Sequence, residues 1–112
     1  MADHKSVRPF MRALAEALRE GKHPSVTPDG NVNWAIFARD LPQMHYETLR
    51  KIRSGDRKLD ARAIEEISTA AGITPEYFAE YRLIKAREMF DPRVVGLDQA
   101  LANLQRLGPE KA

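Results

Sequence analysis

Prolines and glycines divide the chain into short segments, and within these segments the apolar residues repeat at the spacing of an α-helix. The pattern is found in residues 8–20, 33–41, 45–54, 61–71 and 74–90, and again around Leu97, Leu101 and Leu104. No segment shows the strict alternation expected of a half-buried strand. The sequence therefore predicts an all-α fold, a compact bundle of five or six short helices.

Residues at the segment ends support this division into helices. Asn33, Asp60 and Thr74 stand where an N-cap is expected, and each has a side-chain oxygen that can accept a hydrogen bond from the first turn. Gly72 follows the helix over 61–71 and can adopt the left-handed conformation that closes a helix. Pro42 ends the helix that begins after Asn33, because the residue before a proline is disfavoured in the helical region.

Length and composition favour one globular domain. The chain has 112 residues, of which 43% are hydrophobic and 30% charged, with no cysteine and no apolar run long enough to span a membrane. We expect a helical domain over residues 1–90 and an appended helix and tail over 91–112, packed on the same domain. The amino terminus lacks the apolar core of a signal peptide, so a cytoplasmic location is expected.

Basic residues are concentrated in one part of the chain, although the net charge is only +2. Residues 44–58 contain five lysines and arginines against two acidic residues, whereas acidic residues dominate 59–81. This distribution indicates a polarised surface with a basic region that attracts nucleic acid. The alternative is a solvated charged helix face, which is what most charge runs are.

The helix over 45–54 has one apolar and one polar side. With 100° of rotation per residue, Tyr46, Glu47, Arg50, Lys51 and Ser54 share an arc of about 140°, and the apolar Leu49 and Ile52 lie on the opposite side. A helix with such an outer face, preceded by another helix across a proline-containing break, is typical of a helix-turn-helix whose second helix enters the DNA major groove.

Residues 33–78 resemble the DNA-binding domain of phage repressors and Cro proteins, the lambda-repressor-like helix-turn-helix family. The residues that carry the resemblance are Phe37, Ala38, Leu49, Arg53, Gly55, Arg57, Leu59, Ile67, Ile73, Thr74 and Phe78. The carboxy-terminal third is similar in style to small regulators of actinobacteria and their phages. The resemblance implies a sequence-specific regulator of transcription, most often a repressor, whose partner is double-stranded operator DNA.

Two departures from the family pattern concern the geometry of the helix pair. Gln43, Met44 and His45 occupy the turn where the family usually has glycine, an apolar residue and serine, and the turn is one residue longer. Arg53 stands where the family often has a glutamate that pairs with a later arginine. Because Arg53 and Arg57 are both cations here, each is freer to meet a phosphate.

The resemblance implies that Tyr46, Glu47, Arg50 and Lys51 contact base edges. Arg50 or Lys51 can donate to guanine, and Glu47 can accept from the cytosine amino group. The Tyr46 ring can meet a thymine methyl group. Two alternatives stay open: Glu47 can instead pair with Arg50 or Lys51 within its own helix, and Tyr46 can pack on the turn.

Further residues around this helix are expected to contact phosphates. Backbone amides and the positive end of a helix commonly meet the DNA backbone, which points to the start of the helix after residue 32. A lone tryptophan is more often a core residue, so Trp34 can be either a core residue or a phosphate contact. The predicted phosphate contacts are Asn33, Trp34, Thr48, Arg53, Ser54, Arg57 and Lys58.

Little in the sequence points to an enzyme or a cofactor. His4, His23 and His45 are not spaced like metal ligands, and no glycine-rich phosphate loop is present. We therefore expect no catalytic residue, no metal and no cofactor. The main alternative to a DNA-binding regulator is a protein-interaction module of the same fold, an antirepressor or antitoxin, which would need exposed aliphatic residues.

The terminal leucines leave the oligomeric state open. Leu97, Leu101 and Leu104 can form a seam between two copies, or they can pack inside the chain against the first helix. Three residues are too few for a coiled coil, so internal packing with a weak or DNA-dependent homodimer is preferred.

Overall fold

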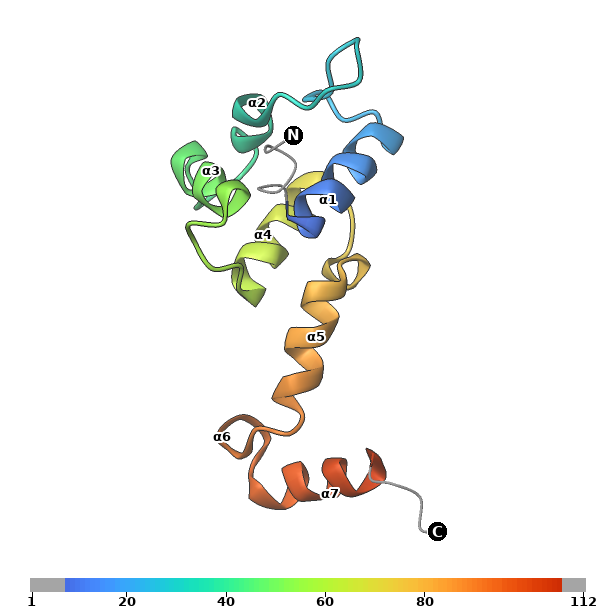
Figure 1. The fold of residues 1–112 in the computed structure, drawn as a ribbon, viewed down its shortest axis with the longest axis vertical. Helices are drawn as coiled ribbons and strands as arrows, with labels where there is room; N and C mark the ends of the chain where they lie inside the picture. Colours follow the sequence, from blue (N-terminus) through green and yellow to red (C-terminus); the bar gives the residue numbers. More distant parts are fainter. Residues whose placement is uncertain (1–7, 108–112) are drawn as a thin grey trace. The chain divides into compact units, whose positions relative to one another are not determined.

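The structure is a computed structural model, and it describes residues 8–107 (Figure 1). Its α-helices are α1 (Pro9–Glu20), α2 (Trp34–Ala38), α3 (Tyr46–Ser54), α4 (Ala61–Ala71), α5 (Ala79–Glu88), α6 (Pro92–Val95) and α7 (Leu97–Leu107). A 3-10 helix, η2 (Pro75–Tyr77), precedes α5. The described residues contain no strand, only an isolated bridge between Val26 and Val32, so the predicted all-α fold class is confirmed there. His4 and the end of the tail, residues 108–112, lie outside the described part.

The chain forms two compact units that divide between Tyr81 and Arg82, inside α5. The first unit contains α1 to α4 and η2, and the second contains the rest of α5 with α6 and α7. No helix in the part that the structure describes is long and apolar enough to cross a lipid bilayer.

Every helix from α1 to α4 contributes to the core of the first unit. The apolar residues face inward at helical spacing, and the rings of Phe10 and Phe78 lie 4.3 Å apart between centroids. The most buried apolar side chains are Phe10, Leu14, Leu18, Phe37, Leu49, Ile52, Ile64, Ile67 and Phe78. Because Leu49 and Ile52 belong to this core, the rotation of α3 about its own axis is fixed.

Two of the three predicted N-caps are confirmed. The Asn33 side chain accepts from the amide of Ile36, and the Asp60 side chain accepts from the amide of Ala63 at 2.9 Å. Gly72 closes α4 in the left-handed region, with φ of +77°. Thr74 occupies the predicted N-cap position, before η2, but its side chain makes no capping bond.

Two helices differ from their predicted extents. The helix after Asn33 ends at Ala38 instead of Leu41, because the amides of residues 39–41 bond three residues back, in the tighter 3-10 pattern. The single helix predicted over 74–90 is interrupted at Phe78, which is extended at φ −93° and ψ 130°. The extended Phe78 separates η2 from α5, and its ring is buried in the core.

The second unit buries few apolar side chains. Ala100 and Asn103 are the buried residues of α7. The side-chain amide of Asn103 donates to the backbone carbonyl of Met89 at 2.7 Å. By contrast, four leucines of α7 are about half exposed or more: Leu97 at 61%, Leu101 at 49%, Leu104 at 56% and Leu107 at 68%. The second unit by itself therefore does not bury these leucines.

Candidate nucleic-acid interface

Helix α3 has the two-sided character that the sequence predicts. Leu49 and Ile52 are fully buried on its inner side. Glu47, Arg50, Lys51 and Ser54 are exposed on the other, and the Tyr46 side chain is 42% exposed. All four residues predicted to contact bases are thus accessible on one helix.

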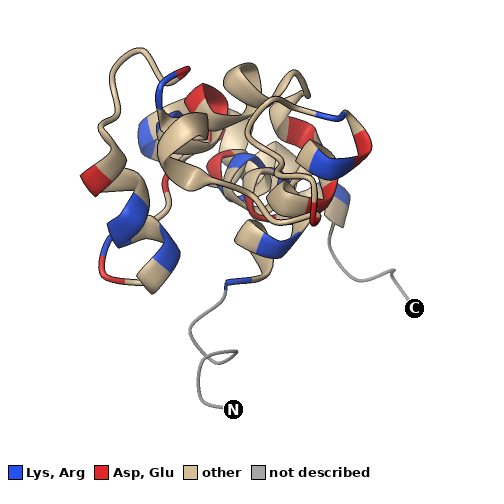
Figure 2. Cartoon of the chain, turned by 90° about the horizontal axis from the view of Figure 1, so that it is seen from above, with Lys and Arg blue, Asp and Glu red and all other residues tan. Residues whose placement is uncertain are grey.

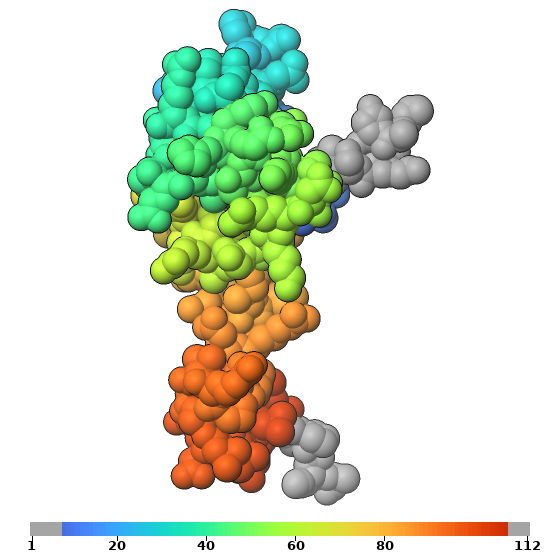
Figure 3. Space-filling model, turned by 90° about the vertical axis from the view of Figure 1, so that its left-hand side faces the viewer, coloured from blue at the N-terminus to red at the C-terminus, as the bar shows by residue number. Residues whose placement is uncertain are grey.

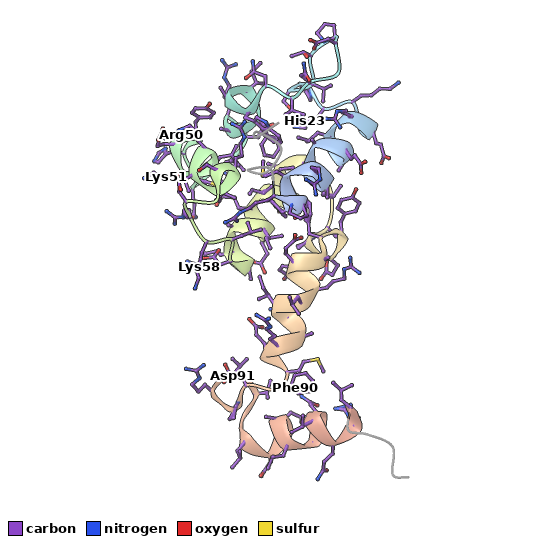
Figure 4. The ribbon with its side chains drawn as sticks, viewed as in Figure 1. His23, Arg50, Lys51, Lys58, Phe90 and Asp91 are labelled. Carbon is purple, nitrogen blue, oxygen red and sulfur yellow. The ribbon has the colours of Figure 1, made fainter. Side chains whose placement is uncertain are left out.

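The exposed side of α3 belongs to a larger surface of the first unit. Figure 4 shows Arg50, Lys51 and Lys58 on the same side, directed away from the body of the unit. In Figure 2, basic residues gather along α3, at the left of the picture. The space-filling view shows that α2, α3 and the loop after α3 form a continuous surface there, coloured from teal to light green (Figure 3).

Glu47 and Arg50 form an ion pair within α3. The Arg50 Nε donates to the Glu47 carboxylate at 3.1 Å, and a second bond comes from Nη2. These hydrogen bonds lower the pKa of the Glu47 carboxyl and raise the pKa of the Arg50 guanidinium. The structure thus contains the within-helix pair considered as an alternative for Glu47. Exposed pairs of this kind contribute little to stability, so a base can compete for either partner.

Arg53 packs on the ring of Trp34. The guanidinium carbon lies 5.5 Å from the ring centroid, a cation–π arrangement. The Trp34 ring also meets Phe37 edge-on, with centroids 6.0 Å apart, yet remains partly exposed. Trp34 is therefore neither a core residue nor a free surface residue. It holds the charged end of Arg53 at the junction of α2 and α3.

The turn between α2 and α3 is held by a side chain of α4. One carboxylate oxygen of Glu66 accepts from the backbone amides of Gln43 and Met44, each at 2.8 Å. No described residue of this turn has a positive φ. The turn therefore contains no left-handed residue and is held by a carboxylate anchor. His45 follows as the exposed N-cap of α3, and its side chain makes no capping hydrogen bond.

The loop after α3 carries two of the predicted phosphate contacts. Gly55 ends α3 in the left-handed region with φ of +88°, and Arg57 and Lys58 follow as exposed residues. The Arg8 guanidinium, just before α1, donates to the carbonyl of Arg57 at 2.9 Å. This bond ties the loop to the start of α1 and was not foreseen from the sequence.

The remaining predicted phosphate contacts have more limited roles. Asn33 uses its side-chain oxygen to cap α2, although the residue is exposed. Thr48 is half-buried, and the Ser54 hydroxyl donates within the helix end to the carbonyl of Lys51 or to Asp56. With only five residues, α2 offers a weak dipole, so an attraction of phosphate to its start rests mainly on nearby side chains.

A groove of about 670 Å³ lies beside α3, between α1 and the residues that lead into α2. Its lining combines four arginines with one acidic residue and a tryptophan: Met11, Arg12, Ala15, Glu16, Arg19, Asn31, Val32, Trp34, Arg50, Arg53 and Ser54. Sequence reasoning missed the two arginines from α1, Arg12 and Arg19. Their seven-residue spacing on one helix face was visible, but the packing of α1 beside α3 was not.

His23 bridges Ser25 and Asp40 in an arrangement with the residue types of a catalytic triad. Its Nε2 lies 3.3 Å from the Asp40 carboxylate, and its Nδ1 accepts from the backbone amide of Ser25 at 3.0 Å. The Ser25 hydroxyl is also 2.9 Å from Nδ1, but Ser25 is only 1% exposed. A buried hydroxyl cannot reach a substrate, so these contacts anchor the loop between α1 and α2. Among residues 8–107, no three acidic or histidine side chains gather as a metal site would require.

Comparisons with models of protein families, with curated proteins and with solved structures found no significant match for this chain.

Proposed function

We propose that the protein is a sequence-specific, double-stranded DNA-binding regulator of transcription, a phage-type repressor that works by occluding a promoter. In this proposal α2 and α3 act as a helix-turn-helix, and α3 enters the major groove of the operator. Tyr46, Glu47, Arg50 and Lys51 contact base edges, while Arg53, Arg57 and Lys58 contact phosphates.

One observation carries the proposal: the exposed side of α3 is polar and basic, while its buried side is locked into the core. Leu49 and Ile52 fix which side faces outward, and the Glu66 bonds to the preceding turn fix where the helix begins. A reading helix must be held in this way, because base contacts tolerate little error in position.

The proposal is tested by selecting from a pool of duplexes with randomised sequence and then measuring the affinity at several salt concentrations. We expect a short consensus to emerge, with an affinity at least about 1000-fold above that for unrelated duplexes at physiological salt. If every duplex bound with the same weak affinity, and salt abolished all of it, specific recognition would be wrong.

A second candidate is a protein-interaction module of the same fold, and the exposed leucines of α7 favour it. Within the regulator proposal, the same leucines suit a weak or DNA-dependent homodimer. Light scattering with and without the selected duplex separates the two functions. A mass that doubles only on DNA supports the regulator, whereas no duplex binding by a chain that self-associates supports the interaction module.

A further inference from the structure

The groove beside α3 is distinguished by its charge. Four guanidinium groups line it, from Arg12, Arg19, Arg50 and Arg53, against one carboxylate from Glu16. A concave surface with a strong excess of one charge concentrates the potential and attracts ions of the opposite sign. The ligand expected here is therefore an anion.

Two of these arginines are held in place by uncharged groups. The Nε of Arg19 donates to the carbonyl of Gly30 at 2.8 Å, and the guanidinium of Arg53 lies over the Trp34 ring. Neither contact neutralises the charge, in contrast to the Glu47 carboxylate that pairs with Arg50. The groove therefore presents positioned positive charges.

The groove also borders the surface proposed to enter DNA. Arg50 and Ser54 belong both to the exposed side of α3 and to the groove lining. A helix with its side chains is about 10–12 Å wide, close to the roughly 12 Å width of the major groove. The side of a helix inserted into the DNA major groove therefore faces a phosphate backbone. The arginine-lined groove of the protein lies on this side of α3.

We propose that the groove seats the phosphate backbone of one DNA strand, so that Arg12 and Arg19 of α1 form a second row of phosphate contacts opposite Arg53. The partly exposed Trp34 ring provides an apolar surface for a sugar between phosphates. This inference rests on the proposed DNA-binding function and extends the interface to a helix outside the α2–α3 pair.

The test compares the salt dependence of duplex binding for Arg12→Gln, Arg19→Gln and the double variant with that of the unaltered chain. Each substitution should reduce the slope of log affinity against log salt by about 0.9, the value for one phosphate contact. Affinity at low salt should fall roughly two- to fivefold per substitution, equally for all sequences. The consensus from randomised-site selection should not change.

Matched variants separate a contact from a folding defect. Glu16→Gln removes the acidic residue of the groove and should strengthen binding to every duplex. Misfolding cannot produce such a gain in affinity. Arg87→Gln removes an exposed arginine of α5 and should leave the slope unchanged. Arg19→Lys, which keeps the charge, should restore most of the slope lost in Arg19→Gln.

Trp34 offers a second readout, because it is the one tryptophan of the chain and lines the groove. Duplex binding should change its fluorescence in the unaltered chain. Inorganic phosphate should change it far less than the duplex does. A saturable effect of phosphate, with no effect of a bound duplex, would assign the groove to a small ligand and overturn the inference. Unchanged salt slopes in both α1 variants, with duplex binding intact, would also overturn it. If the unaltered chain bound no duplex, the regulator proposal would fail, and this inference with it.

Discussion

The Glu66 carboxylate accepts a hydrogen bond from the backbone amide of Met44 at 2.8 Å and thereby ties the turn before α3 to α4. The same oxygen accepts from Gln43, so one side chain satisfies two amides of a turn that has no left-handed residue. The beginning of α3 is consequently set from a helix more than twenty residues later in the chain.

Removing this anchor should affect stability and any function of α3 together. Glu66→Ala leaves two amides of the turn without their partner and should lower the free energy of unfolding by about 1–3 kcal/mol. Glu66→Gln keeps an acceptor oxygen and should lose less than half as much. Urea denaturation measures both values, with the exposed Glu20→Ala as a control for the lost charge. Equal losses for the alanine and glutamine variants would show that the charge, and not the hydrogen bonding, holds the turn.

The sequence predicts the local parts of this architecture well and the long-range parts poorly. The caps at Asn33 and Asp60 and the inner side of α3 follow from residue type and helical spacing alone. The bonds from Glu66 to the turn and from Arg8 to Arg57 could not be foreseen, because they join residues about 22 and 49 positions apart. Phe78 illustrates the same limit, since its burial against Phe10 overrides the helical pattern of its neighbours.

The candidate interface could likewise be predicted from the sequence only in part. Which side of α3 is exposed could be predicted, whereas the partners of the exposed residues depend on rotamers and on other helices. The contact of Arg53 with Trp34 and the place of Arg19 in the groove depend on how helices distant in sequence pack together.

The base and phosphate roles predict different consequences for two exposed cations. Arg50→Ala should relax the preference at one or two base pairs, because a donor to guanine carries sequence information. Lys58→Ala should weaken binding to all sequences about equally and reduce the salt slope by about 0.9. Randomised-site selection and salt titrations on both variants measure these effects. The opposite pattern would mean that the two roles are wrongly assigned.

The ion pair of α3 makes a prediction about pH. Because hydrogen bonding from Arg50 lowers the pKa of Glu47 in the folded chain, the pair contributes stability above the ordinary pKa of 4.5 and loses it as pH falls through the lowered value. Arg50→Ala should therefore raise the pKa of Glu47 towards 4.5. The rise should be incomplete, because Lys51 still attracts the carboxylate. An NMR titration of the Glu47 side chain measures the shift. Arg53→Ala serves as the control and should leave this pKa unchanged.

Ser68 is a polar residue in a place that suits an apolar one. It is fully buried in α4, and its hydroxyl has no hydrogen-bond partner among the described residues. Ser68→Ala removes this unsatisfied group and places a better helix former in α4, so the free energy of unfolding should rise by about 0.5–2 kcal/mol. Thr69→Ala, at an exposed neighbour whose hydroxyl donates to the Glu65 carbonyl, should change stability far less. Thermal and urea unfolding of both variants provide the comparison, and a loss of stability in Ser68→Ala would mean that the hydroxyl has a partner in solution.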